Sequence, residues 1–370
     1  MIYLTKYKTA ASYEQIVVED NLYPQRVHWQ PDTYARAKTG MTYPPQIMTD
    51  KVLTKDVTDY LKNNPTKGKT GFILAAGSQG WAGVRSKNDN RDDGFLHYKY
   101  KMPLVTLTNI FGGRIASSLG AFDYCSTDAS ACASGLKVLM EVQNLMNNFG
   151  FTRMVVLAVE DQINNSTLEF FGRSDASLLL KYEAENKPSA FDPVYHGFNI
   201  GQGAALAIFE TNPPEDPEAE FLGAYTAAED FSNPLGQRPD GMGYQKAILG
   251  ALEVAKLHPS DVKLVKTHGT GTLVNNQAEK TALVTVLKDF VATSYKQRVG
   301  HTLAASGLME TGLLLDDLKQ NLVPGIPNRT NTDDVFLSYD IPTVSGVLLS
   351  LAAGMGNTYS AALFRPVGNV

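Results

Sequence analysis

The chain has 370 residues, of which 43% are hydrophobic and 19% charged, so its composition excludes an intrinsically disordered protein. A formal net charge of −5 at pH 7 argues against a nucleic-acid-binding protein with a uniformly basic surface. No apolar run reaches the ~18 residues of a membrane-spanning helix, and the N-terminal residues lack the long apolar core of a signal peptide. We therefore expect no membrane span and a cytoplasmic location.

The predicted elements of the first half alternate between strands and helices. The first 60 residues show no clear hydrophobic period, and the polar stretch 78–93 is predicted to be a surface loop. Strands are predicted at 71–77, 124–128, 154–159 and 203–209, and helices at 104–119 and in a segment that ends near 149. Strand, helix and strand at this spacing form a βαβ unit.

A proline-rich acidic segment at 212–217 is followed by a second half with a similar order of elements. Here we predict helices at 246–257 and 303–318, and strands at 262–265, 347–351 and 360–364. The chain is therefore predicted to be an α/β protein with an N-terminal half, residues 1–212, and a C-terminal half, residues 213–370. We find no residue-level repeat between the halves, so only the order of elements suggests a duplication.

The first segment that can carry chemistry contains Cys132, at the junction of a predicted strand and a helix. The chain has only one other cysteine, Cys125, which is too few for a disulfide framework or a zinc site. A helix N-terminus favours a thiolate by about 0.3–1 kcal/mol, and its free N–H groups can stabilise an oxyanion. The alternative is a small buried cysteine that packs behind the helix.

Two further segments each contain a histidine next to glycine. His268 lies in a turn directly after a predicted strand, where ligand sites of α/β folds concentrate, with Thr270 and Thr272 close behind it. His301 follows a glycine at the start of a helix rich in small residues. Each segment alone is equally compatible with a structural role, as a turn in the first case and a helix cap in the second.

Together the three segments resemble the active-site motifs of the elongating β-ketoacyl-ACP synthases, which belong to the thiolase superfamily. The resemblance covers about residues 69–364 and includes 191–192, 197–198, 201–204 and the glycine-rich segment 354–358. It implies a thiolase-like fold, in which two similar α/β halves form a layered α-β-α-β-α architecture. The late loop lacks the second catalytic cysteine of a thiolase, and a second histidine stands where the starter-type synthases carry asparagine.

The resemblance also implies the chemistry, a decarboxylative Claisen condensation. Cys132 would accept an acyl group from acyl carrier protein, and His268 and His301 would bind the thioester oxygen of malonyl-ACP as CO₂ leaves. Lys296 is expected to pair with Glu310.

Supporting roles follow from the same resemblance. Glu279 is expected to join the polar network of the lysine, and the N–H groups of Cys132 and Met355 to stabilise the oxyanion of acyl transfer. Thr270 and Thr272 would hold the phosphopantetheine arm. Since acyl carrier protein supplies that arm, we expect no metal and no soluble cofactor. The expected partners are acyl carrier protein, acyl and malonyl thioesters, and a second copy or a related synthase subunit in a dimer.

The sequence departs from the family pattern at several positions. Asn276 and Gln202 stand where acidic residues are usual, and Met355 replaces a bulky aromatic gate. The usual glycine-rich N-terminal strand is not evident in residues 1–20. These departures indicate a specialised fatty-acid or polyketide (polyene-like) pathway, and the two lost carboxyl groups would change the histidine pKa values in a direction that the sequence leaves open.

Two alternatives remain open on the same scaffold. The first is a non-catalytic partner subunit of the chain-length-factor kind, against which the presence of Cys132, His268, Lys296 and His301 argues. The second is an acyltransferase that does not decarboxylate its substrate, which would need only the cysteine and one histidine.

Overall fold

The computed structural model describes residues 1–11, 49–77, 107–160, 188–194, 196–213, 216–332 and 334–367. The predicted loop at 78–93 lies outside these residues. The strands are β1 Ile2–Ala11, β2 Lys69–Ala76, β3 Tyr124–Asp128, β4 Phe151–Glu160, β5 Gly203–Glu210, β6 Ala219–Ala228, β7 Val262–Lys266, β8 Val291–Thr293, β9 Val347–Gly354 and β10 Thr358–Pro366. The α-helices are α4 Lys55–Asn63, α7 Thr108–Leu119, α8 Ser134–Asn148, α10 Met242–Ala255, α11 Leu273–Val286, α12 Lys296–Val299 and α13 Ser306–Lys319. The 3₁₀ helices are η1 Ala131–Ala133, η2 Pro259–Asp261 and η3 Leu303–Ala305.

The strand order reveals two copies of one unit. The described sheet runs β3-β2-β4-β5-β1-β6-β10-β9-β7-β8, so its second five strands repeat the first five in reverse order. In each copy, the three strands farthest from the junction are parallel to one another, β3-β2-β4 in the first copy and β8-β7-β9 in the second. The other two strands of each copy run antiparallel to their neighbours. A short antiparallel pairing of β1 with β6 joins the copies. The predicted boundary at 212/213 falls in the connection between β5 and β6.

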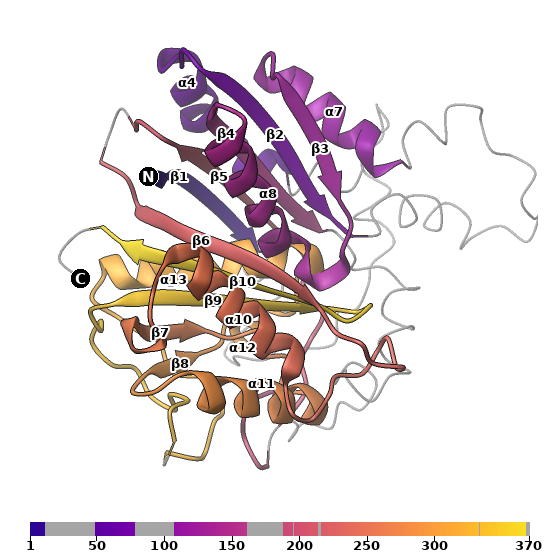
Figure 1. The fold of residues 1–370 in the computed structure, drawn as a ribbon, viewed down its shortest axis with the longest axis vertical. Coiled ribbons are helices and arrows are strands. Elements are labelled where there is room, and N and C mark those ends of the chain that lie inside the picture. Colours follow the sequence, from indigo (N-terminus) through magenta and orange to yellow (C-terminus); the bar gives the residue numbers. More distant parts are fainter. Residues whose placement is uncertain are drawn as a thin grey trace, which may run out of the picture.

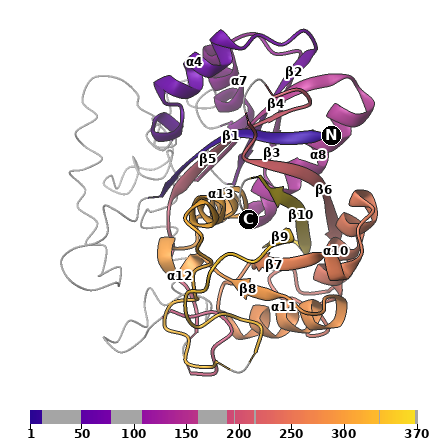
Figure 2. The same ribbon diagram turned by 90° about the vertical axis from the view of Figure 1, so that its left-hand side faces the viewer.

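The helices divide the molecule into layers. Figure 1 shows the N-terminal half above the C-terminal half, and Figure 2 shows α4 and α7 on one outer side and α10 and α11 on the other. Between them, α8 contacts strands of both halves, and so does α13. Buried apolar side chains form one central cluster and one outer cluster in each half. The chain therefore has the thiolase-like α-β-α-β-α architecture that the sequence predicts.

The first 60 residues contain structure that the sequence analysis missed, β1 and α4. β1 contains no glycine, but it occupies the place of an N-terminal strand between β5 and β6. The strand β6, the helix α11 and the strand β8 were also missed. The helix predicted at 104–119 begins at Thr108, and the helix predicted at 246–257 begins earlier, at Met242.

The structure also corrects the statement that no residue-level repeat exists. The helices η1 and α8 occupy in the first half the place that η3 and α13 occupy in the second, between the third and fourth strands. When η1 is matched with η3 and α8 with α13 at their first residues, Ala-Ser-Gly-Leu at 133–136 corresponds to the same four residues at 305–308. The repeat is only four residues long, which is too short to stand out in the sequence alone. In this alignment Cys132 corresponds to Ala304.

Candidate active site

Cys132 lies on a sharp turn between β3 and α8. The preceding residue, Ala131, has φ 48°, a left-handed conformation that costs energy for any residue with a side chain. Asp128 holds this turn by accepting the N–H of Ser130 at 2.9 Å and by an ion pair with Lys137. The turn places the sulfur at the N-terminal end of the central helix, with the cysteine only 6% exposed.

Burial dominates the protonation of this sulfur. It raises the pKa of the Cys132 thiol to about 12, the positive charge of Lys296 opposes the increase, and the negative charge of Glu160 adds to it. The sequence-based expectation that the helix N-terminus favours a thiolate is therefore outweighed. In the free protein the group is a thiol.

His268 is held by its backbone. The side chain of Glu279, on α11, accepts the N–H of His268 at 2.6 Å and the N–H of Gly269 at 2.9 Å. Gly271 has φ 74°, and a Cβ there would lie 2.2 Å from the carbonyl oxygen of Ser189. The turn therefore requires glycine at this position. The Nδ1 atom of the buried His268 ring has no hydrogen-bond partner among the described residues.

His301 has a defined tautomer. Its Nδ1 accepts the N–H of Leu303 at 3.2 Å and lies 2.9 Å from Ser306 Oγ. Since a nitrogen that accepts a hydrogen bond carries no proton in a neutral ring, the proton is on Nε2. The edge of the Phe198 ring packs against the imidazole, with ring centroids 5.1 Å apart. His301 is therefore a hydrogen-bond donor through Nε2.

The two imidazoles lie side by side. Their ring centroids are 5.6 Å apart, and the ring planes are nearly perpendicular. Burial lowers the pKa of His268 and of His301 well below its ordinary value, and the positive charges of Lys296 and Lys266 lower both further. Both rings are therefore neutral at physiological pH.

A buried charge cluster lies behind these groups. Glu310 accepts from Lys296 Nζ at 2.8 Å through Oε1, so the two residues pair as the sequence predicts. Its other oxygen, Oε2, accepts from Lys266 Nζ at 3.2 Å. The sequence analysis assigned no role to Lys266, which lies directly after the strand predicted at 262–265. Its position at the end of a strand, directly before the turn that contains His268, is the signal that could have identified it.

Lys296 lies close enough to all three predicted reactive residues for its charge to act on each of them. Its charge acts on the pKa of Cys132, of His268 and of His301. In addition, η1, which contains the cysteine, packs against η3, which begins two residues after His301. The structure thus brings together three segments that are remote in sequence.

Glu160, at the end of β4, is a second site residue that the sequence analysis missed. Its Oε2 accepts the N–H of Gly77 at 3.0 Å and the N–H of Ala304 at 3.3 Å. The acidic residue that ends a run of apolar residues was its signal in the sequence. Because its charge acts on Cys132, it belongs to the surroundings of the sulfur.

The remaining predicted residues lie around this centre. Thr270 Oγ1 is 3.1 Å from Thr272 Oγ1, and the latter caps α11 by accepting the N–H of Asn275. Asn276 donates to the carbonyl oxygen of Gly271 at 3.5 Å.

The C-terminal loop also reaches the cysteine turn. A Cβ on Gly354 would lie 2.7 Å from the carbonyl oxygen of Ser130, so the backbone next to Met355 packs against the turn. The Met355 side chain is 41% exposed. Gln202 is half-buried in the segment whose neighbour, Gly201, donates to the carbonyl oxygen of His301. Glu279 accepts the backbone N–H groups of the His268 turn, and its charge also acts on Lys266 of the buried charge cluster.

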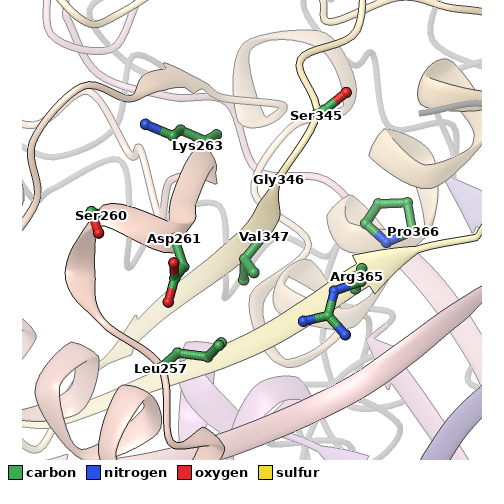
Figure 3. A pocket seen from close by; sticks show the side chains of 9 residues that line it. All are labelled: Leu257, Ser260, Asp261, Lys263, Ser345, Gly346, Val347, Arg365 and Pro366. Carbon is green, nitrogen blue, oxygen red and sulfur yellow. The ribbon is translucent and has the colours of Figure 1, made fainter.

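A surface hollow of about 520 Å³ lies away from this chemistry (Figure 3). Its lining includes Lys263 and Val347, which stand at the beginning of β7 and β9, whereas His268 and Gly354 follow or end the same strands. Within the described residues, no group of three or more His, Cys, Asp and Glu side chains could hold a metal ion. In the same residues, no helix has the length and apolar character to cross a membrane.

Comparison with known proteins identifies the family of the chain. The family model of the β-ketoacyl synthase N-terminal domain matches residues 49–213, and that of the C-terminal domain matches residues 218–330. A putative oxytetracycline polyketide β-ketoacyl synthase 1 of Streptomyces rimosus is 28% identical over 65% of this chain and 60% of its own length. A 3-oxoacyl-[acyl-carrier-protein] synthase homolog of Saccharomyces cerevisiae is 25% identical over 72% of this chain and 64% of its own.

Solved structures show the same fold. A type II polyketide acyl-carrier protein in complex with its ketosynthase contains a chain with a TM-score of 0.83, at 19% identity over 99% of both chains. A ketosynthase of Xenorhabdus doucetiae in complex with its chain length factor gives a TM-score of 0.75, at 18% identity over 99% of this chain and 98% of that chain. The chain spans 60 to 64% of the length of the first two curated relatives. With both domain models matched in order, the chain belongs to the β-ketoacyl synthase family.

Proposed function

We propose that this protein catalyses the decarboxylative Claisen condensation of malonyl-ACP with an acyl group held on Cys132, in a specialised fatty-acid or polyketide pathway. The observation that carries the proposal is the pair of neutral histidines, 5.6 Å apart, beside a buried cysteine and a buried lysine. The family and the fold support it. The departures at Asn276, Gln202 and Met355 favour a specialised pathway over general fatty-acid synthesis.

The first half-reaction is acyl transfer. The sulfur of Cys132 attacks the acyl-ACP thioester carbonyl, and the proton of its thiol passes to the departing phosphopantetheine sulfur. The N–H groups of Cys132 and Met355 serve as donors to the tetrahedral oxyanion, because the Met355 backbone follows a glycine that packs on the cysteine turn. The product is an acyl-enzyme thioester and free carrier protein.

The second half-reaction forms the new carbon–carbon bond. The malonyl thioester oxygen accepts the Nε2–H of His301 and a hydrogen bond from His268. As CO₂ leaves, the electron pair of the broken bond becomes an enolate, which the two donors stabilise. The enolate carbon attacks the acyl carbonyl on Cys132, and the cysteine sulfur departs. A neutral histidine suits this role because it donates a hydrogen bond and does not protonate the carbanion.

The substrates bring the prosthetic group. Thr270 and Thr272 hold the phosphopantetheine arm of acyl carrier protein, so the reaction needs no metal and no soluble cofactor. We propose that the protein acts in the cytoplasm as a dimer, with a second copy or with a related subunit. The complexes solved for similar folds, one with a carrier protein and one with a chain length factor, support these partners.

Intact-mass measurement after mixing with acyl-ACPs of several chain lengths tests the first half-reaction. The wild type should gain the mass of one acyl group, and Cys132→Ala should gain none. The size of the gain for each chain length ranks the substrates. A wild type that gains no acyl mass from any carrier would contradict the proposed enzyme and favour a non-catalytic partner subunit.

Release of CO₂ from malonyl-ACP tests the second half-reaction. His301→Ala should keep acylation of Cys132 but lose decarboxylation by about 100-fold, the usual effect of removing an oxyanion donor. If the variant decarboxylates at the wild-type rate, the histidine has another role. If the wild type acylates but releases no CO₂, an acyltransferase without decarboxylation is the better description.

A further inference from the structure

The buried cluster contains one more cation than an ion pair requires. Lys266, the last residue of β7, is fully buried, and only Thr267 separates it from His268 along the chain. Its Nζ donates to the carbonyl oxygen of Leu351 on β9 at 2.7 Å and to Glu310 Oε2 on α13 at 3.2 Å. A lysine in the interior of a protein is rare unless it is paired, and here its partner is shared.

Glu310 therefore lies between two ammonium groups. Oε1 accepts from Lys296 and Oε2 from Lys266, so each oxygen of the carboxylate has its own cation. A carboxylate held at both oxygens cannot rotate, and this fixes the position from which it binds Lys296. The three charged groups add up to one net positive charge.

We propose that Lys266 is a positioning residue for the condensation site: it clamps Glu310 at the oxygen that Lys296 does not bind, and it adds a buried positive charge near the two histidines. The inference rests on the proposed function for its consequence in catalysis. The contacts that support it are independent of that function.

The electrostatic effect of Lys266 is selective. It is among the charges that lower the pKa of His268 and of His301, whereas the charges that act on Cys132 are those of Lys296, Glu160 and Glu310. Removal of Lys266 should therefore change the histidines and leave the cysteine as it is. Removal of Lys296 should change all three.

The charged groups that face Lys266 come from three elements. They are Glu310 on α13, Lys296 on α12 and Glu279 on α11. Burial lowers the pKa of Lys266 to about 8, the two carboxylates oppose this decrease, and the ammonium group of Lys296 adds to it. The positive charge is thus present at pH 7 and is lost as the pH rises through about 8. Decarboxylation should decline over the same range.

The test compares Lys266→Met with Lys263→Met in a Cys125→Ser background. Lys263 lies on the same strand, is partly exposed and pairs with Asp289, so its replacement controls for the loss of a lysine from β7. NMR titration of the labelled imidazoles, which needs no carrier protein, should give higher midpoints for His268 and His301 in Lys266→Met only. The rate at which iodoacetamide alkylates Cys132 should stay within about twofold.

Catalysis supplies the second readout. Lys266→Met should lower decarboxylation of malonyl-ACP at pH 7 by about tenfold and lose the decline near pH 8. Lys266→Arg, whose side chain stays charged, should retain activity, and its decarboxylation rate should decline only at higher pH. This variant keeps the test valid if Lys266→Met does not fold. Unchanged histidine midpoints in Lys266→Met, or an unchanged decline in Lys266→Arg, would overturn the inference. Because the NMR readout involves no substrate, it decides on Lys266 even if the proposed condensation is wrong.

Discussion

A sulfur at a helix N-terminus inside a protein is subject to two opposing effects. The helix dipole favours the thiolate by about 0.3–1 kcal/mol. Burial raises the pKa of Cys132 from 9.0 to about 12, which corresponds to roughly 4 kcal/mol in favour of the thiol. Burial is the larger effect, so the turn contributes to catalysis through its oxyanion donors and its geometry, and the sulfur loses its proton only as the substrate reacts.

This comparison predicts the pH dependence of alkylation. In a Cys125→Ser background, the rate of Cys132 alkylation by iodoacetamide should rise up to pH 10 without reaching a plateau, because the thiolate fraction still increases there. Lys296→Met should lower the rate at every pH in this range, since it removes the charge that stabilises the thiolate. A plateau below pH 9 would show that the thiol ionises much more readily than its burial implies.

At the residue scale, the sequence was sufficient where motifs are local. Cys132, His268 and His301 could be predicted because each lies in a short segment with a recognisable composition. Lys266 and Glu160 could not, since their roles depend on partners that are distant in sequence. Glu310 is 44 residues from Lys266, and Ala304 is 144 residues from Glu160.

At the scale of elements, burial decided what the sequence could predict. The strands β4 and β5 are buried along almost their whole length, so they form continuous apolar runs. In the missed strand β6, buried residues are interrupted by partly exposed ones, which include Glu220 and Thr226. The missed helix α11 has a narrow apolar face, because its buried side also carries Asn275 and Glu279 for the His268 turn. The polar residues on the buried side of α11 therefore weaken the helical hydrophobic pattern of this segment in the sequence.

The cap of α11 gives a prediction at this scale. Thr272 Oγ1 accepts the N–H of Asn275 at 3.3 Å, so Thr272→Ala should lower the free energy of unfolding by about 1 kcal/mol. Thr285→Ala, at an exposed position of the same helix, should change it by no more than about 0.5 kcal/mol. Urea denaturation measures both. Equal effects of the two substitutions would argue against the cap and leave pantetheine binding as the only role of Thr272.

At the scale of the whole molecule, the two halves depend on each other. The central cluster combines apolar residues of both, and each central helix packs on strands of the other half. The cysteine comes from one half and the histidines and lysines from the other, so the site exists only when the halves pack together. The repeat Ala-Ser-Gly-Leu lies at this contact. A Cβ on Gly135 would lie 2.7 Å from the carbonyl oxygen of Ala304, and a Cβ on Gly307 would lie 2.6 Å from Leu136 Cγ.

The close approach at Gly135 predicts a loss of stability that begins at the contact between the halves. Gly135→Ala places a methyl group against a backbone oxygen that cannot rotate away, and should lower the free energy of unfolding by about 1–3 kcal/mol. The control is Gly113→Ala on α7, where a Cβ has nothing within 4 Å among the described residues and should raise stability by about 0.5–1 kcal/mol. Urea denaturation of both variants measures the difference. Because the shifted backbone carries Ala304, three residues after His301, Gly135→Ala should also lower the rate of decarboxylation. If Gly135→Ala were as stable as Gly113→Ala, the two halves would be less tightly packed than the glycine contact requires.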